Sequence, residues 1–166
     1  MDAPRWLDER EDRAWRGYRR MRRLLDLELA RELMQDARLS EPDYDVLSDL
    51  SETPDQRLRL SELADRMLWS RSRLSHHLSR MQQRGLVTRE ECPSDGRGSI
   101  VVLTPAGRQA IEAAARGHVA AVRRHLIDLL TPDEVEALAA LTHRVVDHLN
   151  QPDRPGDDRR RAAPGA

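Results

Sequence analysis

Apolar residues recur every three or four positions over most of the chain, which is the period of amphipathic helices. The first such stretch covers residues 8–38, and its apolar face consists of Trp15, Tyr18, Met21, Leu25, Leu29 and Leu33. A second helix is predicted to begin near Ser40, because Ser40 and Asp43 have the spacing of a capping box and Pro42 suits a first turn. Residues 51–54 end that helix.

Two short helices joined by a tight turn follow, which is the arrangement of a helix-turn-helix. The first runs from Ser61 to Leu68, and a break at Trp69 and Ser70 separates it from the second. The second helix extends from Ser70 to Arg84 and ends before Gly85.

The hydrophobic period changes after Gly85. Residues 86–90 and 99–103 have the composition of β-strands, and the segment 91–98 between them contains Pro, Ser, Asp and two Gly. Such a segment is typical of a hairpin loop. A helix-turn-helix followed by a hairpin predicts a winged helix-turn-helix.

Two more helices are predicted after the hairpin. Residues 104–105, a Thr and a Pro, suit an N-cap and a first helical position, and that helix is expected to run to about Leu130. A capping box at residues 131–134 opens the last helix, which extends to about Leu149. Residues 151–166 combine Pro and Gly with a run of charges, so we expect a disordered tail there.

Composition and charge narrow the function only by exclusion. The 166 residues include 28 basic and 29 acidic ones, so the net charge of −1 gives no global sign of a nucleic-acid partner. The single cysteine, Cys92, excludes a disulfide within the chain. The N-terminal segment, residues 1–23, is too charged for a signal peptide, and no apolar run approaches the roughly 20 residues of a membrane span. We therefore expect a soluble, cytoplasmic protein without a membrane partner.

One segment departs from this balance of charge. Residues 66–89 contain no Asp or Glu, and their basic side chains are Arg66, Arg71, Arg73, His76, His77, Arg80, Arg84 and Arg89. The segment covers the second helix of the helix-turn-helix, the element that enters the major groove in DNA-binding proteins of this kind. A solvated basic face is the alternative interpretation, and the hairpin that follows argues against it.

The two faces of this helix differ in chemistry. At about 100° per residue, the core face consists of Leu74, His77, Leu78 and Met81. The opposite face and its flanks carry Ser72, Arg73, Ser75, His76, Ser79, Arg80 and Gln83. Hydroxyl, imidazole, amide and guanidinium groups can bond base edges and phosphates, so this is the predicted DNA-reading face.

The predicted hairpin tip, residues 95–98, places Arg97 between two glycines. An arginine there can reach into a minor groove, where negative potential is concentrated. Asp95 lies two residues earlier and can hold the Arg97 side chain extended.

These motifs resemble the MarR family of bacterial regulators over residues 10–149. The specific stretches are Arg84–Arg89 (RGLVTR), Asp95–Arg97 (DGR), Val101–Thr104 (VVLT), Gly107 and Ser61–Ala64 (SELA). The resemblance implies a homodimer in which the N- and C-terminal helices of two chains interlock. Two winged lobes then read adjacent major grooves of a pseudo-palindromic DNA duplex. It also implies a repressor that a small effector, phenolic or otherwise toxic, releases from DNA.

The resemblance further implies which residues contact DNA: Ser70, Arg71, Ser72, Arg73, Ser75, His76, Arg80 and Arg89. It places Arg97 in the minor groove, braced by Asp95. In this family an effector pocket lies between the dimer helices and the winged lobe. Candidates for its lining here are Trp15, Tyr18, Tyr44 and Trp69.

The terminal helices carry more apolar surface than a lone chain can cover, which independently favours a dimer. The stripes of the two C-terminal helices consist of Val119, Val122, Leu126, Leu130, Leu138, Leu141, Val145, Val146 and Leu149. An isologous interface would cover them. We therefore expect a mainly α fold with a small β-hairpin wing. Its parts are an N-terminal dimerisation helix, a winged DNA-binding lobe, C-terminal dimerisation helices and a tail, at residues 1–38, 39–104, 105–150 and 151–166.

Other kinds of site have weaker support. No metal or cofactor is expected, because the i, i+4 spacing of a helix-borne metal pair is absent from His118, His125, His143 and His148. Glu90 and Glu91 beside Cys92 disfavour the thiolate that a redox sensor needs. Motifs of hydrolases and phosphate-binding loops are lacking, so we do not expect an enzyme. The open alternative is a ligand- or protein-binding module that keeps the fold without DNA binding, and residues 66–89 argue against it.

Overall fold

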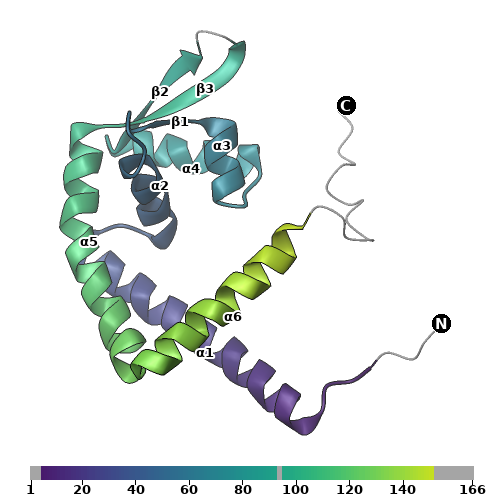
Figure 1. The fold of residues 1–166 in the computed structure, drawn as a ribbon. Coiled ribbons are helices and arrows are strands. Elements are labelled where there is room, and N and C mark those ends of the chain that lie inside the picture. The colour runs from purple at the N-terminus through teal and green to yellow at the C-terminus, as the bar shows by residue number, and fades with distance from the viewer. Residues whose placement is uncertain (1–4, 93–94, 152–166) are drawn as a thin grey trace. The chain divides into compact units, whose positions relative to one another are not determined.

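The computed structural model describes the backbone of residues 5–92 and 95–151, and the side chains of residues 5–91 and 98–151. The chain divides into two compact units, Met1–His125 and Leu126–Ala166. Figure 1 shows the helices and the one small sheet of the described residues, which confirm the predicted fold class. The predicted tail lies outside the described residues from position 152 onward.

The first helix, α1 (Glu9–Ala37), confirms the helix predicted over residues 8–38. Asp8 and Glu11 form a capping box at its start, with N–H to carboxylate distances of 2.9 and 2.8 Å. The helix packs against α5 (Pro105–His125) and buries Leu33. Nearer its N-terminus, Trp15 and Tyr18 are 50% and 49% exposed.

The second helix, α2 (Glu41–Ser51), begins as predicted. The Ser40 hydroxyl accepts from the Asp43 N–H at 3.3 Å, and the Asp43 carboxylate accepts from the Ser40 N–H at 2.9 Å. Its apolar face is fully buried, so this short helix is fixed by both its cap and its packing.

The helix-turn-helix consists of α3 (Leu60–Arg66) and α4 (Arg71–Gln83). The start of α3 is one residue earlier than predicted, and its N-cap, Arg59, makes no capping bond through its side chain. In the turn, Leu68 has a left-handed φ of 53°. The Ser70 hydroxyl caps α4 by accepting from the backbone N–H of Arg73 at 3.2 Å.

The sheet has three antiparallel strands in the order β1-β3-β2, one more than predicted. The missed strand, β1 (Arg57–Arg59), is too short for an alternating pattern to show in the sequence. The hairpin strands, β2 (Val87–Cys92) and β3 (Asp95–Leu103), extend into what was predicted as loop. The antiparallel ladder continues, with one irregularity, to a Cys92–Asp95 pair, so the described residues of the predicted loop belong to the strands.

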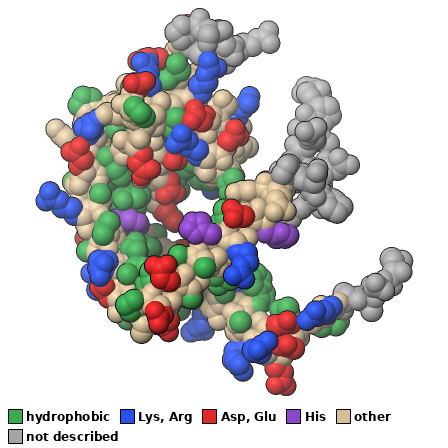
Figure 2. Space-filling model, viewed as in Figure 1, with side chains coloured by type: hydrophobic (Ala, Val, Ile, Leu, Met, Phe, Trp, Pro, Cys, Tyr) green, Lys and Arg blue, Asp and Glu red, His purple; other side chains and the backbone are tan. Residues whose placement is uncertain are grey.

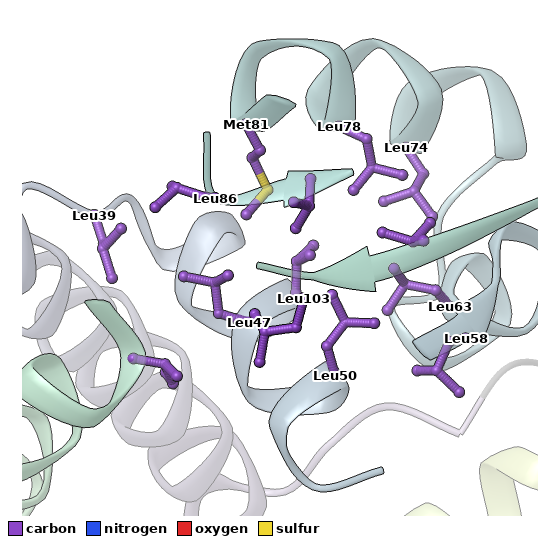
Figure 3. Close-up of a cluster of buried hydrophobic side chains, with 14 of the residues drawn as sticks. Leu39, Leu47, Leu50, Leu58, Leu63, Leu74, Leu78, Met81, Leu86 and Leu103 are labelled. Atoms are coloured by element: carbon purple, nitrogen blue, oxygen red, sulfur yellow. The ribbon is translucent and has the colours of Figure 1, made fainter. Parts of the chain in front are cut away.

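One apolar core joins α2, α3, α4 and the sheet. Figure 3 shows its side chains converging from these elements, among them Leu47, Leu50, Leu58, Leu63, Leu74, Leu78, Met81, Leu86 and Leu103. Burying a leucine stabilises a fold by about 1.5–3 kcal/mol, so this core fixes which face of α4 points inward.

The start of α5 is anchored to the hairpin. The Thr104 hydroxyl lies 2.7 Å from the carbonyl oxygen of Gly85 and accepts from the N–H of Gly107 at 2.9 Å. A Cβ atom at Gly107 would lie 2.0 Å from the carbonyl oxygen of Leu86, so only glycine permits this approach.

The predicted end of α5 near Leu130 is wrong, because the chain leaves helical geometry at Leu126 and forms a short 3₁₀ turn, Ile127–Leu129. In the second unit, α6 (Pro132–Asn150) starts with the predicted capping box at Thr131. No side chain of residues 132–150 is buried. Among the helices described above, none is long and apolar enough to cross a membrane.

Candidate nucleic-acid interface

The outward face of α4 is the candidate interface. Its predicted core residues Leu74, His77, Leu78 and Met81 are buried, which confirms the division of the helix into two faces. The residues of the predicted reading face are exposed or, for Ser75, half-buried: Arg71, Ser72, Arg73, Ser75, His76, Ser79 and Arg80. The first turn of α4 contains no acidic residue that would oppose a phosphate.

Trp69 supports an arginine of this face. The Arg73 guanidinium carbon lies 3.7 Å from the centre of the Trp69 ring, and that ring makes a T-shaped contact with His77, with 5.6 Å between ring centres. A cation over an indole face is attracted to it. Trp69 therefore holds Arg73 beside the start of α4.

Arg89 is bound within the lobe. Its guanidinium donates to the carbonyl oxygen of Ser75, and it lies 3.3 Å from each of the Ser75 and Ser79 hydroxyl oxygens. These contacts tie β2 to α4. Arg66 likewise binds Glu62 at 2.8 Å, so both of these basic residues of the acid-free segment have partners inside the protein.

The two wing residues predicted to contact DNA, Asp95 and Arg97, lie at the start of β3. Their side chains lie outside the described residues, as does that of Cys92. Their roles therefore stay predictions.

A buried polar network behind α4 was missed in the sequence. Asp43 and His77 are 4% and 6% exposed, and the Asp43 carboxylate lies 3.1 Å from Nε2 of His77. Arg84 Nη1 donates to the same carboxylate at 2.7 Å. Burial alone would raise the pKa of Asp43, but hydrogen bonds from His77, Ser40 and Arg84 outweigh it and hold that pKa below its usual range.

The four residues predicted to line an effector pocket do not come together within one chain. Trp15 and Tyr18 stack on each other at 5.9 Å, Tyr44 lies against His118 at 4.4 Å, and Trp69 contacts α4. A different pocket, of about 230 Å³, lies between α1 and α5. It is lined mostly by alanines, with two leucines and a glycine, and by the polar residues Glu32, Asp36 and His118.

One polar residue of this pocket is already paired. Glu32 accepts from Arg124 and lies 2.7 Å from Nε2 of His125, and these hydrogen bonds, from His125 and then Arg124, lower its pKa. Among the side chains described for residues 5–91 and 98–151, no three His, Cys, Asp or Glu residues are placed to hold a metal ion.

Charge is mixed over the rest of the surface. On the face in Figure 2, basic and acidic side chains lie interspersed, in keeping with the near-neutral net charge. The basic, acid-free segment around α4 therefore stands out locally and not through the protein's overall field.

Known proteins share this architecture. The model of the MarR family matches residues 39–98. The Transcriptional regulator HosA of Escherichia coli O111:H- is 31% identical over 100 residues, which are 60% of this chain and 72% of HosA.

Two solved structures from Streptomyces coelicolor are similar over nearly their whole length. AbsC, a MarR family transcriptional regulator, is 42% identical with a TM-score of 0.83, over 88% of this chain and 98% of AbsC. Sco3205, a MarR family transcriptional regulator in complex with DNA, is 40% identical with a TM-score of 0.87, over 93% of this chain and 97% of Sco3205. The winged fold and these likenesses place the chain in the MarR family of transcriptional regulators.

Proposed function

We propose that this protein is a sequence-specific DNA-binding repressor that binds a pseudo-palindromic operator as a homodimer. The observation that carries the proposal is the exposed, acid-free outward face of α4, in a chain 40% identical to a relative crystallised with DNA. The helix has the position in the fold of a recognition helix, and its side chains offer both donors and acceptors to base edges.

The contacts divide by chemistry. Ser70, Arg71, Ser72, Ser75 and His76 lie in the first turns of α4 or at its cap and read base edges in the major groove. Arg73 and Arg80 flank them and bind phosphates, with Trp69 supporting Arg73. Arg89, held against α4, orients that helix relative to the wing.

The wing supplies the minor-groove contact. Arg97 enters that groove, and Asp95 braces it. The support is the position of both residues at the start of β3, at the far end of the β2–β3 ladder. An arginine in a narrow minor groove gains from the negative potential concentrated there.

Large apolar side chains that are exposed to solvent in the single chain support dimerisation. On α1 they include Trp15, Tyr18, Met21, Leu24 and Leu27, and on α6 they include Leu141, Val145, Val146 and Leu149. Exposed apolar side chains spaced along two helices are typical of an interface. In this proposal residues 1–38 and 105–150 form the dimer frame, and residues 39–104 form the reading lobe.

A small, phenolic or otherwise toxic effector regulates the dimer. Tyr44 and Trp69 are only partly buried against the core of the lobe, and Trp15 and Tyr18 are exposed, so a second chain can complete a pocket that one chain lacks. The effector acts by favouring a spacing of the lobes that does not fit DNA, which requires a differential affinity for that state. A dimer that covers a promoter blocks polymerase, which is why we assign repression.

Fluorescence anisotropy tests this proposal. The DNA upstream of the protein's own gene is titrated at two salt concentrations, with a scrambled duplex as control. We expect tight binding that prefers the native duplex and weakens with salt by a log–log slope of about −0.9 for each phosphate contact. Equal binding to both duplexes, or no binding at low salt, would overturn the proposal for that operator and favour a module without DNA specificity.

A further inference from the structure

The Asp43–His77 pair couples the core to one residue of the DNA-facing surface, Arg80. His77 lies on the buried face of α4, and its Nε2 is 3.1 Å from the Asp43 carboxylate on α2. Its other ring nitrogen, Nδ1, lies 2.9 Å from Nη2 of Arg80. Arg80 follows three residues later, is exposed, and belongs to the flank of the reading face.

The chemistry of arginine determines which nitrogen of His77 carries the proton. A guanidinium has only donors, so Nδ1 must accept the hydrogen bond from Arg80. In the neutral imidazole the proton then sits on Nε2, which faces Asp43. The Asp43 carboxylate favours the tautomer with the proton on Nε2. Nδ1 is then unprotonated and can accept the hydrogen bond from Arg80.

The imidazole has little freedom to leave this orientation. The Trp69 ring packs against it in a T-shaped contact, and His77 is only 6% exposed. Asp43 is itself fixed by the Ser40 N–H at 2.9 Å and by Arg84 Nη1 at 2.7 Å. The charged and titratable groups in contact with His77 are thus Asp43 on α2 and Arg80 on α4, with Arg84 behind Asp43.

We propose that Asp43 and His77 are positioning residues that hold the Arg80 guanidinium ready to contact DNA. This inference rests on the proposed function, in which Arg80 binds a phosphate. A long arginine side chain loses rotamer freedom when it binds a ligand, and an acceptor that fixes it beforehand reduces that loss. Arg80 Nη1 also lies 3.5 Å from the carbonyl oxygen of His76, four residues earlier on α4. This second contact keeps the guanidinium close to the helix.

Two substitutions at the same position separate the two contacts of the ring, Nε2 with Asp43 and Nδ1 with Arg80. In His77→Gln the amide reaches the place of Nε2 and keeps a donor toward Asp43, but no acceptor remains for Arg80. In His77→Asn the amide oxygen takes the place of Nδ1 and keeps the acceptor. We expect His77→Gln to weaken operator binding about as much as Arg80→Ala, by about tenfold for one charge-assisted bond. His77→Asn should recover most of that loss.

A double-mutant cycle on the operator is the decisive measurement. If His77 acts through Arg80, His77→Gln should weaken binding in the wild-type background and have little further effect in the Arg80→Ala background. Thermal unfolding of each variant checks that the fold is retained. A loss of the same size in both backgrounds would mean that His77 only stabilises the lobe, and it would overturn the inference.

Two further outcomes separate this inference from the proposed function. Operator binding by the wild type that Arg80→Ala leaves unchanged would overturn the inference alone. A wild type that binds no operator would overturn both.

The tautomer of His77 can be measured separately in the free protein, because the ¹⁵N chemical shifts of the imidazole distinguish its two nitrogens. We expect the proton on Nε2, and a proton on Nδ1 would contradict the proposed hydrogen bond to Arg80.

Discussion

Arg84 at the end of α4 binds Asp43 on α2, with Nη1 2.7 Å from a carboxylate oxygen. Its Nη2 also donates to the carbonyl oxygen of Arg38 at 2.7 Å, where α1 ends in a left-handed residue. One guanidinium therefore joins the ends of α1 and α4 to the start of α2. Together with the apolar core, this contact holds the candidate recognition helix against the rest of the first unit.

Arg84→Ala should lower the free energy of unfolding by about 2 kcal/mol, because it leaves a buried carboxylate with fewer donors. The expected loss is smaller than for a fully buried pair, since the Arg84 side chain is 42% exposed. Urea denaturation at neutral pH measures it. Arg71→Ala is the matched control, because Arg71 is an exposed arginine of the same helix outside this network. Equal stability of the two variants would contradict the role given to Arg84.

The lowered pKa of Asp43 makes part of the stability depend on pH. In the unfolded chain this carboxyl has a pKa near 3.9, so around that pH the unfolded state binds more protons than the folded one. The stabilisation is therefore fully present above about pH 5 and is lost as the pH falls through the acid range.

Asp43→Asn tests this dependence. The variant should be less stable than the wild type at pH 7, and the difference should shrink as the pH is lowered toward 3. Denaturation midpoints at a series of pH values give the comparison. A difference that stays constant across the series would show that the effect comes from packing and not from the ionised carboxylate.

Two glycines of α5 should respond to alanine in opposite ways. At Gly107 a Cβ would lie 2.0 Å from the Leu86 carbonyl oxygen and 2.9 Å from a methyl group of Leu103. We expect Gly107→Ala to destabilise the protein by about 2 kcal/mol or more through overpacking. At Gly117 the nearest atom to a Cβ is an Asp36 carboxylate oxygen at 3.9 Å, so Gly117→Ala should stabilise the helix by about 0.5–1 kcal/mol. Thermal unfolding of both variants decides, and a shift in the same direction would contradict the geometry.

Local signals in the sequence predicted the local parts of the fold. The capping boxes at Ser40 and Thr131 each depend on two residues three positions apart, and both form as predicted. The buried face of α4 follows from helical period alone. The end of α5 was misplaced because apolar residues continue beyond His125 at helical spacing, although the backbone has left the helix.

The parts that sequence reasoning missed depend on contacts between distant residues. Asp43 and Arg84 are 41 positions apart, and nothing in either local pattern indicates that they meet. The sequence predicts His77 in the core and Asp43 at a helix cap, and both predictions are confirmed, but neither indicates that the two residues meet. An available signal was that a histidine on an apolar face needs a hydrogen-bonding partner. Arg89, which the family resemblance predicts to contact DNA, lies with its guanidinium against Ser75 and Ser79, a contact that its sequence context does not indicate.

Two arginines of the lobe should weaken operator binding for different reasons. Arg89 is bonded inside the lobe, so Arg89→Ala should reduce stability and affinity while leaving the salt dependence of binding unchanged. Arg97 is proposed to enter the minor groove, so Arg97→Ala should leave stability unchanged and reduce the log–log salt slope by about 0.9. Anisotropy titrations at several salt concentrations, together with thermal unfolding, give both quantities for each variant. A reduced slope in Arg89→Ala would show that this side chain leaves α4 to bind phosphate in the complex. An unchanged slope and affinity in Arg97→Ala would remove the wing from the proposed interface, and α4 alone would then account for DNA binding.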